Sequence, residues 1–442
     1  MSDLFSHELE SLASPLITWR RYLHRYPEEG WTEFATVAFL AATLERWGFR
    51  LTMGEDALCS ASRMGLPAPE VLTGAASRAH AHGVESRWLG IVHNGMTALW
   101  ADIALGPASQ QAPLLVLRFE MDALPINEAR DAAHYPVCEG FASLHHGLMH
   151  ACGHDGHMAI GLGLARLLSK CRESFSQPLR VRLLFQPAEE SVRGAQALAA
   201  AGAVDGAQWL LGLHIGIAAQ HTGELVCGVD NFLATSKIDA RFTGLAAHAG
   251  SAPQKGHNAL LAASAAALGL HAISRNGQGD TRVCVGTLNA GQCRNTIPAH
   301  ASMELEVRAS NDSVHQWLDT EAQRVLAAAA DLWHCTEKHC LAGRAPAASS
   351  HPLLRSVVQA CAGRVPFFKP VRPSCSFGAS EDFSLLVNSV HEAGGQANYM
   401  LVGSQLAGGH HTPYFDFDEK VLLPSVALLA QTCHALSLQH TA

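Results

Sequence analysis

The feature that most constrains the fold is a regular alternation of strand-like and helix-like apolar runs between residues 114 and 215. Three short apolar runs, LLVLRFE (114–120), VRLLFQ (181–186) and WLLGLHI (209–215), are typical of buried strands. Longer runs at 158–170 and 191–202 predict helices between them. Because strands joined by helices pair in parallel and are covered on both faces, the pattern predicts an α/β domain with a mostly parallel sheet.

The pattern changes between residues 231 and 342. The predicted elements there are, in order, a strand at 233–243, a helix at 257–274, strands at 282–288 and 301–308, a helix at 313–330 and a strand at 332–339. This β-α-β-β-α-β order is ferredoxin-like. We therefore expect an α+β domain at 231–342, inserted into a discontinuous catalytic domain made of residues 1–230 and 343–442.

The two ends of the chain complete the predicted catalytic domain. Residues 9–48 predict two helices around the turn at 26–30, and residues 55–95 predict an insertion of loop and irregular helix. After a linker at 343–352, the chain predicts a helix, a strand at 398–402 and a terminal helix at about 423–436.

Composition narrows the function classes. The 442 residues carry a net charge of −8 without basic runs, which argues against nucleic acid as a partner. The stretches 256–274 and 421–442 are better explained as buried helices than as membrane spans, and the N-terminus lacks the pattern of a signal peptide. The 12 cysteines form no CxxC pair, which is typical of a reducing compartment. We expect a cytoplasmic protein that binds neither nucleic acid nor membranes.

Polar groups follow the predicted strands at the points where the strands end, and a similar pair precedes the last helix. These groups are Asp122, the loop His150–His157, the pair Glu189-Glu190, His214 and the pair His410-His411. An open α/β sheet binds its ligands at the carboxyl ends of its strands, so we expect these groups to converge. Each alone has an ordinary structural explanation, such as a hydrogen-bonded histidine or a solvated helix start.

Together, these residue types predict a metal centre. A thiolate, imidazoles and carboxylates are ligands for Zn²⁺ or another first-row divalent ion, and Cys152 and His154 can reach around one ion. Adjacent carboxylates suggest a division of labour, in which one binds metal and the other moves a proton. A base beside a metal-bound water is the arrangement of a hydrolase.

These motifs resemble the M20 metallopeptidase family in its amidohydrolase/aminoacylase branch. The motifs, in chain order, are WRR and GWTEF near the N-terminus, RFEMDALP (118–125), MHACGHDGH (149–157), QPAEE (186–190), GLAAHA (244–249), NTIP (295–298) and SEDF (380–383). SRMGLP (62–67) and FDFDE (415–419) resemble the subgroup that acts on p-aminobenzoyl-glutamate. The resemblance covers essentially the whole chain.

The resemblance implies a site with two divalent ions. Its ligands would be Cys152, His154, Glu190, His214 and His411, with Cys152 as the bridge. Glu189 would be the general base and then the general acid. Ligand softness favours Zn²⁺, whereas members of the branch often use Mn²⁺, so we favour Mn²⁺ and keep Zn²⁺ as the alternative.

Further roles are implied outside the metal ligands. The inserted domain would be a lid and dimerisation domain, whose His248 reaches an active site, often that of the partner, and stabilises the oxyanion. Asn295 would help to hold the substrate, and Arg308 is a candidate for binding its carboxylate. Asp122 and Asp155 would orient ligand imidazoles.

The predicted reaction is metal-dependent hydrolysis of a small N-acyl amino acid. The expected substrate is p-aminobenzoyl-glutamate, cleaved to p-aminobenzoate and glutamate. One alternative is a general N-acyl-amino-acid amidohydrolase acting on hippurate-like or N-acetylated substrates. Another is a subunit that needs a homologous partner for activity, so both a homodimer and a heterodimer through the lid domain remain open.

Overall fold

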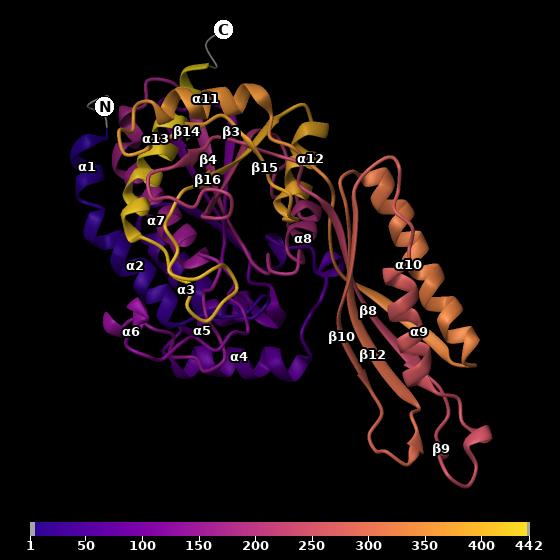
Figure 1. Cartoon of the computed structure of the whole chain (residues 1–442). Helices are drawn as coiled ribbons and strands as arrows, with labels where there is room; N and C mark the ends of the chain where they lie inside the picture. The colour runs from indigo at the N-terminus through magenta and orange to yellow at the C-terminus, as the bar shows by residue number, and fades with distance from the viewer. Residues whose placement is uncertain (1–4, 440–442) are drawn as a thin grey trace.

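The computed structural model describes residues 5–439, so residues 1–4 and 440–442 of the predicted catalytic domain lie outside the described part. The chain forms a large body and a long arm that projects from it (Figure 1). Elements from both ends of the chain, indigo and yellow in Figure 1, lie together in the body. The arm consists of residues 234–345, from the first to the last strand of a separate four-stranded sheet.

An eight-stranded sheet with the order β1-β2-β4-β3-β5-β16-β6-β14 forms the centre of the body. Its four middle strands run parallel to one another, which confirms the predicted mostly parallel sheet. These middle strands are β4 (Leu179–Gln186), β3 (Leu114–Glu120), β5 (Ala207–Ile215) and β16 (Gln396–Val402). The outer strands are β1 (Arg50–Met53) and β2 (Leu99–Leu105) at one side, and β6 (Leu225–Val226) and β14 (Val371–Arg372) at the other.

Both faces of this sheet are buried. Along β3, Leu115 and Leu117 belong to one hydrophobic cluster, whereas Leu114 and Val116 belong to a second cluster on the other face. The helices that contribute to the first cluster include α2 (Ala13–Arg25), α3 (Phe34–Arg46), α7 (His154–Cys171), α11 (Pro352–Ala362) and α13 (Leu422–Leu438). Those of the second cluster are α8 (Ala195–Ala200) and α12 (Phe383–Glu392). Burial on both faces explains why β3 reads as a continuous apolar run.

The sequence-based boundaries differ from the structure in several places; for example, the last strand of the inserted domain was expected at 332–339 and spans Thr336–Ala345. Within the insertion at 55–95, α4 (Pro69–Ala81) is a regular helix of 13 residues. The helix predicted at 191–202 begins only at Ala195, because Ser191 and Val192 have φ values of +69° and +57°. The remaining short helices are α1 (Ser6–Glu10), α5 (Ser86–Ile91) and α6 (Tyr135–Cys138).

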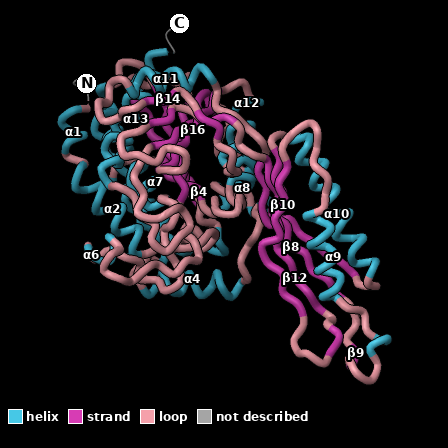
Figure 2. Tube along the Cα trace, in the orientation of Figure 1, coloured by secondary structure: helices cyan, strands magenta, loops and turns pink. Residues whose placement is uncertain are grey.

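The arm has the predicted β-α-β-β-α-β order and the antiparallel strand order β10-β12-β8-β13. Its elements are β8 (Ala234–Thr243), α9 (Ala259–His271), β10 (Thr281–Ala290), β12 (His300–Ala309), α10 (Asp312–Leu332) and β13 (Thr336–Ala345). Both helices cover the outer face of the sheet, and the other face is turned toward the body (Figures 1 and 2). A small sheet of β9 (Ala247–His248) and β11 (Thr296–Ile297) lies at the far tip of the arm (Figure 1).

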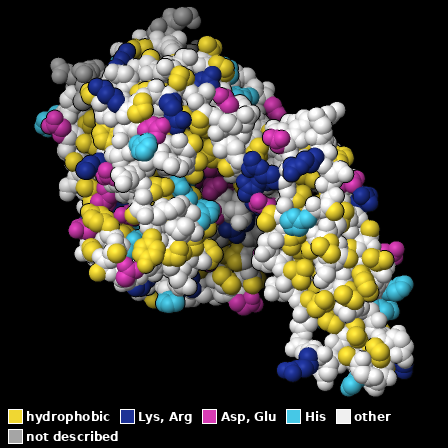
Figure 3. All heavy atoms as spheres, viewed as in Figure 1, with side chains coloured by type: hydrophobic (Ala, Val, Ile, Leu, Met, Phe, Trp, Pro, Cys, Tyr) yellow, Lys and Arg dark blue, Asp and Glu magenta, His cyan; other side chains and the backbone are white. Residues whose placement is uncertain are grey.

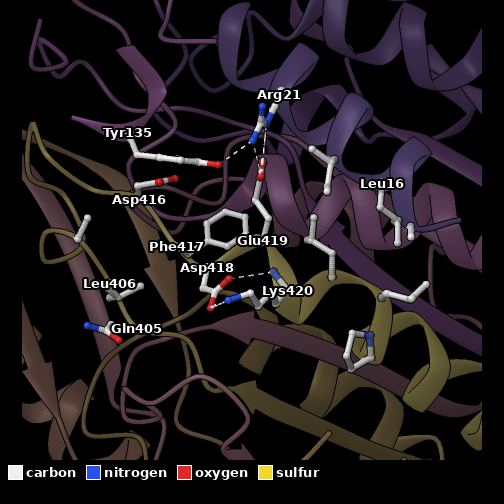
Figure 4. Close-up of a pocket in the computed structure, with 16 residues that line it drawn as sticks. Leu16, Arg21, Tyr135, Gln405, Leu406, Asp416, Phe417, Asp418, Glu419 and Lys420 are labelled. Atoms are coloured by element: carbon white, nitrogen blue, oxygen red, sulfur yellow. Dashed lines mark hydrogen bonds and ion pairs between the residues drawn. The ribbon is translucent and has the colours of Figure 1, made fainter. Parts of the chain in front are cut away.

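Two surface features bear on the search for a site. The segment Glu419–Leu438 is long and apolar enough to cross a membrane, but 67% of its apolar window is buried in the body. A groove of about 740 Å³ lies between α2 and residues 405–424, where Arg21 is paired with Glu419 (Figure 4). No residue with a predicted catalytic, metal-binding or substrate-binding role lines this groove.

Candidate metal centre

The predicted metal ligands come together at the carboxyl-terminal edge of the sheet. Cys152 Sγ lies 3.4 Å from His214 Nε2 at the end of β5. His411 Nε2 lies 3.3 Å from Glu190 Oε1. Donor atoms of Cys152, His154 and His214 lie within 4.8 Å of one another, and so do those of Cys152, Glu190 and His411. Cys152 belongs to both groups.

Backbone carbonyl groups fix the orientation of two imidazoles. His154 Nδ1 donates to Asp122 O at 2.7 Å, and His214 Nδ1 donates to Ile215 O at 2.8 Å. In the neutral form of each ring, the Nε2 atom then carries the lone pair that a metal ion would bind. The buried Nε2 of His154 has no hydrogen-bond partner among the described residues. A buried nitrogen without a partner is costly, and a bound cation would remove that cost.

Asp122 organises the loop that carries the two glutamates. Its carboxylate accepts hydrogen bonds from the backbone N–H groups of Glu189, at 3.0 Å, and Glu190, at 2.9 Å. Just before them, Ala188 has a φ of +52° and donates its N–H to Glu33 Oε1 at 2.9 Å. Buried carboxylates thus hold the loop in a backbone conformation that non-glycine residues seldom adopt.

Glu189 differs from Glu190 in its surroundings. Its Oε2 lies 3.7 Å from His154 Nε2, and its carboxylate forms a buried acidic group with Glu381 and Asp382. Burial, followed by the charges of Glu381 and Glu190, raises the pKa of Glu189 well above its ordinary value. A carboxyl group with a raised pKa is suited to accept and return a proton.

The charges around the donor atoms fit a cation. Burial and the charges of Glu190 and Glu189 raise the pKa of the Cys152 thiol, so the thiolate needs a compensating positive charge. Burial lowers the pKa of His154, but the hydrogen bond to Asp122 and the charges of Glu120, Asp122 and Glu190 raise it to about 10. The chemistry of the donor set therefore fits bound divalent ions.

Several residues that support the site were not predicted from the sequence. Glu120 Oε2 lies 3.0 Å from His157 Nδ1, and His157 Nε2 accepts the N–H of Ile215 at 3.0 Å. Arg118 donates to Glu381 at 2.8 Å and to Asp382 at 3.0 Å, and so balances their charge. All of these residues stand within the family motifs: Arg118, Glu120, His157 and the Glu381-Asp382 pair. Their place in the motifs was the sequence signal that could have identified them.

Asp155 does not orient a ligand imidazole, unlike the expectation. Its Oδ2 lies 3.0 Å from Arg20 Nε and 2.8 Å from His24 Nδ1. Arg20 and His24 both belong to α2, so this carboxylate ties the start of α7 to that helix. Asp122 does contact a predicted ligand, His154, through its carbonyl oxygen.

Two of the residues predicted to bind substrate or oxyanion, His248 and Asn295, lie apart from this cluster. His248 is in β9 at the tip of the arm, where its Nδ1 accepts the N–H groups of Gly250 and Ser251, each at 3.1 Å. Asn295 is close by, since its carbonyl oxygen accepts the N–H of Ala249 at 2.9 Å. Arg308 lies instead at the base of the arm, with Nη1 3.4 Å from Ser380 Oγ of the body.

The α/β body, the arm and this donor set with an additional carboxylate define a metal-dependent amidohydrolase. The sequence profile of peptidase family M20/M25/M40 matches residues 116–435, and the chain belongs to this family.

Relatives of known name match almost the whole chain. It is 42% identical over 425 residues to the A subunit of p-aminobenzoyl-glutamate hydrolase from Escherichia coli, covering 96% of each chain. It is 41% identical over 430 residues to indole-3-acetyl-aspartic acid hydrolase of Enterobacter agglomerans, covering 97% of each chain. The crystal structure of an aminobenzoyl-glutamate utilization protein from Klebsiella pneumoniae matches with a TM-score of 0.81 and 35% identity, covering 97% of this chain and 98% of that one.

Proposed function

We propose that this enzyme hydrolyses the amide between an aromatic acyl group and an acidic amino acid, with p-aminobenzoyl-glutamate as its main substrate. The observation that carries the proposal is the 42% identity, across 96% of both chains, to one chain of a p-aminobenzoyl-glutamate hydrolase. Indole-3-acetyl-aspartate is a second candidate, because the hydrolase of that name is 41% identical. Both names describe an aromatic acyl group joined to an acidic amino acid.

Two divalent ions would be held by Cys152, His154, Glu190, His214 and His411, with the Cys152 thiolate between them. The donor distances and the buried Nε2 of His154, which has no hydrogen-bond partner among the described residues, support this assignment. We favour Mn²⁺, with Zn²⁺ as the alternative. When bound, such ions polarise the amide carbonyl and lower the pKa of a water molecule.

Glu189 would take a proton from the attacking water and return it to the amine of the departing amino acid. Its buried position 3.7 Å from His154 and its raised pKa support this role. Arg308 would bind the α-carboxylate of the substrate through the guanidinium edge that faces Ser380.

His248 and Asn295 would act on the site of a partner protomer, because both lie at the arm tip in their own chain. His248 Nε2 makes no hydrogen bond with the described residues, so it would be free to donate to the oxyanion while Asn295 holds the substrate. We propose a dimer through the arms, either of two copies or with a homologous subunit. The 12 free cysteines support a cytoplasmic location.

The test is p-aminobenzoate release from p-aminobenzoyl-glutamate by the purified chain, with and without Mn²⁺ or Zn²⁺ after chelation. Indole-3-acetyl-aspartate and hippurate serve as comparisons. We expect rapid metal-dependent release from the aminobenzoyl substrate and slow cleavage of hippurate. Cleavage of hippurate alone would identify a general aminoacylase. No cleavage of any substrate until a homologous subunit is added would identify a partner-dependent chain.

A further inference from the structure

A cluster of cationic side chains lies on the face of the arm sheet that is turned toward the body. Glu306 and Arg308 are two residues apart on β12 and so point to the same face. In the pairing register, Lys237 of β8 stands opposite Glu306, and Arg282 of β10 stands opposite Arg308. Their neighbours Leu305, Val307 and Ile238 belong to the core beneath α9 and α10. The four polar residues therefore face away from the helices.

This cluster contains more positive than negative charge. Glu306 accepts two hydrogen bonds from Arg308, at 2.9 and 3.0 Å, and also pairs with Lys237. Arg282 donates to the carbonyl oxygen of Gly378 at 3.0 Å, and the described residues give it no carboxylate partner. Cross-strand pairs of like charge, such as Arg282 and Arg308, are destabilising. The sheet therefore keeps two uncompensated cations at its base, a charge that an anionic ligand would balance.

The cluster borders the proposed reaction site. Arg308 contacts Ser380 and Arg282 contacts Gly378, both in the body segment that precedes Glu381. Carboxylate oxygens of Glu381 and Glu189 lie within 4.8 Å of each other. Burial lowers the pKa of Lys237, whereas the hydrogen bond to Glu306 and the charge of Glu189 favour its charged form. Figure 3 shows Lys and Arg side chains on the arm side of the hollow between arm and body, facing acidic and histidine side chains.

We infer that Lys237, supported by Arg282, binds the side-chain carboxylate of an acidic amino acid whose α-carboxylate is held by Arg308. This inference rests on the proposed function and deepens it. A dicarboxylic leaving group carries two negative charges, and the cluster offers two cations beyond the one that Glu306 balances. Lys237 is thus a specificity-determining residue that separates conjugates of acidic amino acids from those of neutral ones.

The experiment compares p-aminobenzoyl-glutamate with p-aminobenzoyl-glutamine, which has nearly the same shape but a neutral side chain. We expect the wild-type enzyme to prefer the glutamate conjugate by between about 10- and 100-fold in kcat/KM, as for hydrogen bonds to a charged group. Lys237→Met should reduce this preference to about onefold, because kcat/KM falls for the glutamate conjugate. Lys237→Arg should keep the preference. Arg241→Gln, an exposed substitution on the same face of β8 farther from the body, is the matched control.

The outcomes separate the two proposals. A wild-type enzyme that cleaves both conjugates equally well contradicts this inference and leaves the proposed function intact. One that cleaves neither conjugate, even after a homologous subunit is added, contradicts the proposed function, and the inference with it. If Lys237→Met fails to fold, as judged by circular dichroism, the ratio of kcat/KM for the two conjugates is measured on Arg282→Gln instead. Arg282 is exposed, so this substitution should not disturb folding. A ratio equal to that of the wild type in a folded Lys237 or Arg282 variant would overturn the inference.

Discussion

At the residue scale, Glu189 and Glu190 are adjacent in the chain but their carboxylates meet different surroundings. Glu190 faces His411, whereas Glu189 faces His154 and the Glu381-Asp382 pair. Their backbone N–H groups both donate to Asp122, which fixes the loop so that the two side chains point to different neighbours. Burial and neighbouring charge, rather than residue type, therefore distinguish the proposed base from the proposed ligand.

Glu189→Gln should abolish most of the activity while metal binding is retained. The amide keeps the shape of the side chain but cannot accept the proton, so we expect kcat to fall by a factor of about 10² to 10⁴. Metal content measured by elemental analysis should match that of the wild type. The exposed Glu173→Gln is the matched control. Near-normal turnover of the Glu189→Gln enzyme would show that another group moves the proton.

Asp122→Asn should weaken metal binding as well as activity. An amide has one acceptor oxygen, so it cannot accept both N–H groups of Glu189 and Glu190 as the carboxylate does. We expect a loss of metal affinity of about 10- to 100-fold, measured by competition with a chelating dye. Asp205→Asn, at an exposed position, should leave the affinity unchanged. Unaltered affinity in the Asp122 variant would refute its positioning role.

At the element scale, short polar contacts decide where helices begin. The pattern at 191–202 indicated one helix, but tertiary contacts hold residues 188–193 in a turn, and α8 starts at Ala195. Helix α3 starts at Phe34, and the buried Glu28 carboxylate accepts the N–H groups of Ala35, at 3.1 Å, and Thr36, at 2.8 Å. Neither arrangement follows from hydrophobic periodicity, because the acceptors come from outside the helix.

The buried carboxyl group of Glu28, which accepts hydrogen bonds at the start of α3, should make the free energy of unfolding depend on pH. Burial raises its pKa from 4.5 to about 7, although the hydrogen bonds from Thr36 and Ala35 lower it. Because the folded state binds this proton more tightly than the unfolded state, stability falls as the pH rises from about 4.5 to 7. Glu28→Gln should therefore gain up to about 3 kcal/mol relative to the wild type between pH 4.5 and 8.

Urea unfolding of both proteins at several pH values measures this difference. The exposed Glu70→Gln should show no such gain. An equal free-energy difference between the Glu28 variant and the wild type at all pH values would contradict the prediction.

At the scale of the whole molecule, the arm separates residues that the proposed reaction needs together. His248 and Asn295 lie at its tip, whereas the metal ligands lie in the body (Figure 1). One chain alone therefore presents an incomplete site under the proposed function. A partner protomer would complete it, which is why we expect activity to depend on association.

Mixed dimers test this expectation. Glu189→Gln lacks the base, and His248→Ala lacks the group supplied to the partner. In a mixed dimer, the site with an intact Glu189 would receive an intact His248 from the other protomer. We therefore expect coexpression of the two inactive variants to restore roughly a quarter to a half of wild-type activity. No recovery in dimers of verified composition would mean that His248 acts within its own chain or not at all.

The sequence by itself determined the class of fold, because the periods of its apolar residues distinguish strands from helices and their order distinguishes the body from the arm. The positions of the polar groups at the strand ends were also enough to predict that they converge at the sheet edge, whereas the resemblance to the family singled out Cys152, His154, Glu190, His214 and His411 among them. These properties depend on local pattern and on the geometry common to α/β sheets.

Only the tertiary structure decided which hydrogen bonds orient those groups and which neighbouring charges shift their pKa values. The sequence suggested that Asp155 orients a ligand, but packing of α7 against α2 places it beside Arg20 and His24. The contacts of Glu120 with His157 and of Lys237 with Glu306 likewise join segments distant in the chain. Long-range packing sets which charges are neighbours and how deeply they are buried, and these two quantities fix pKa values and ligand preference.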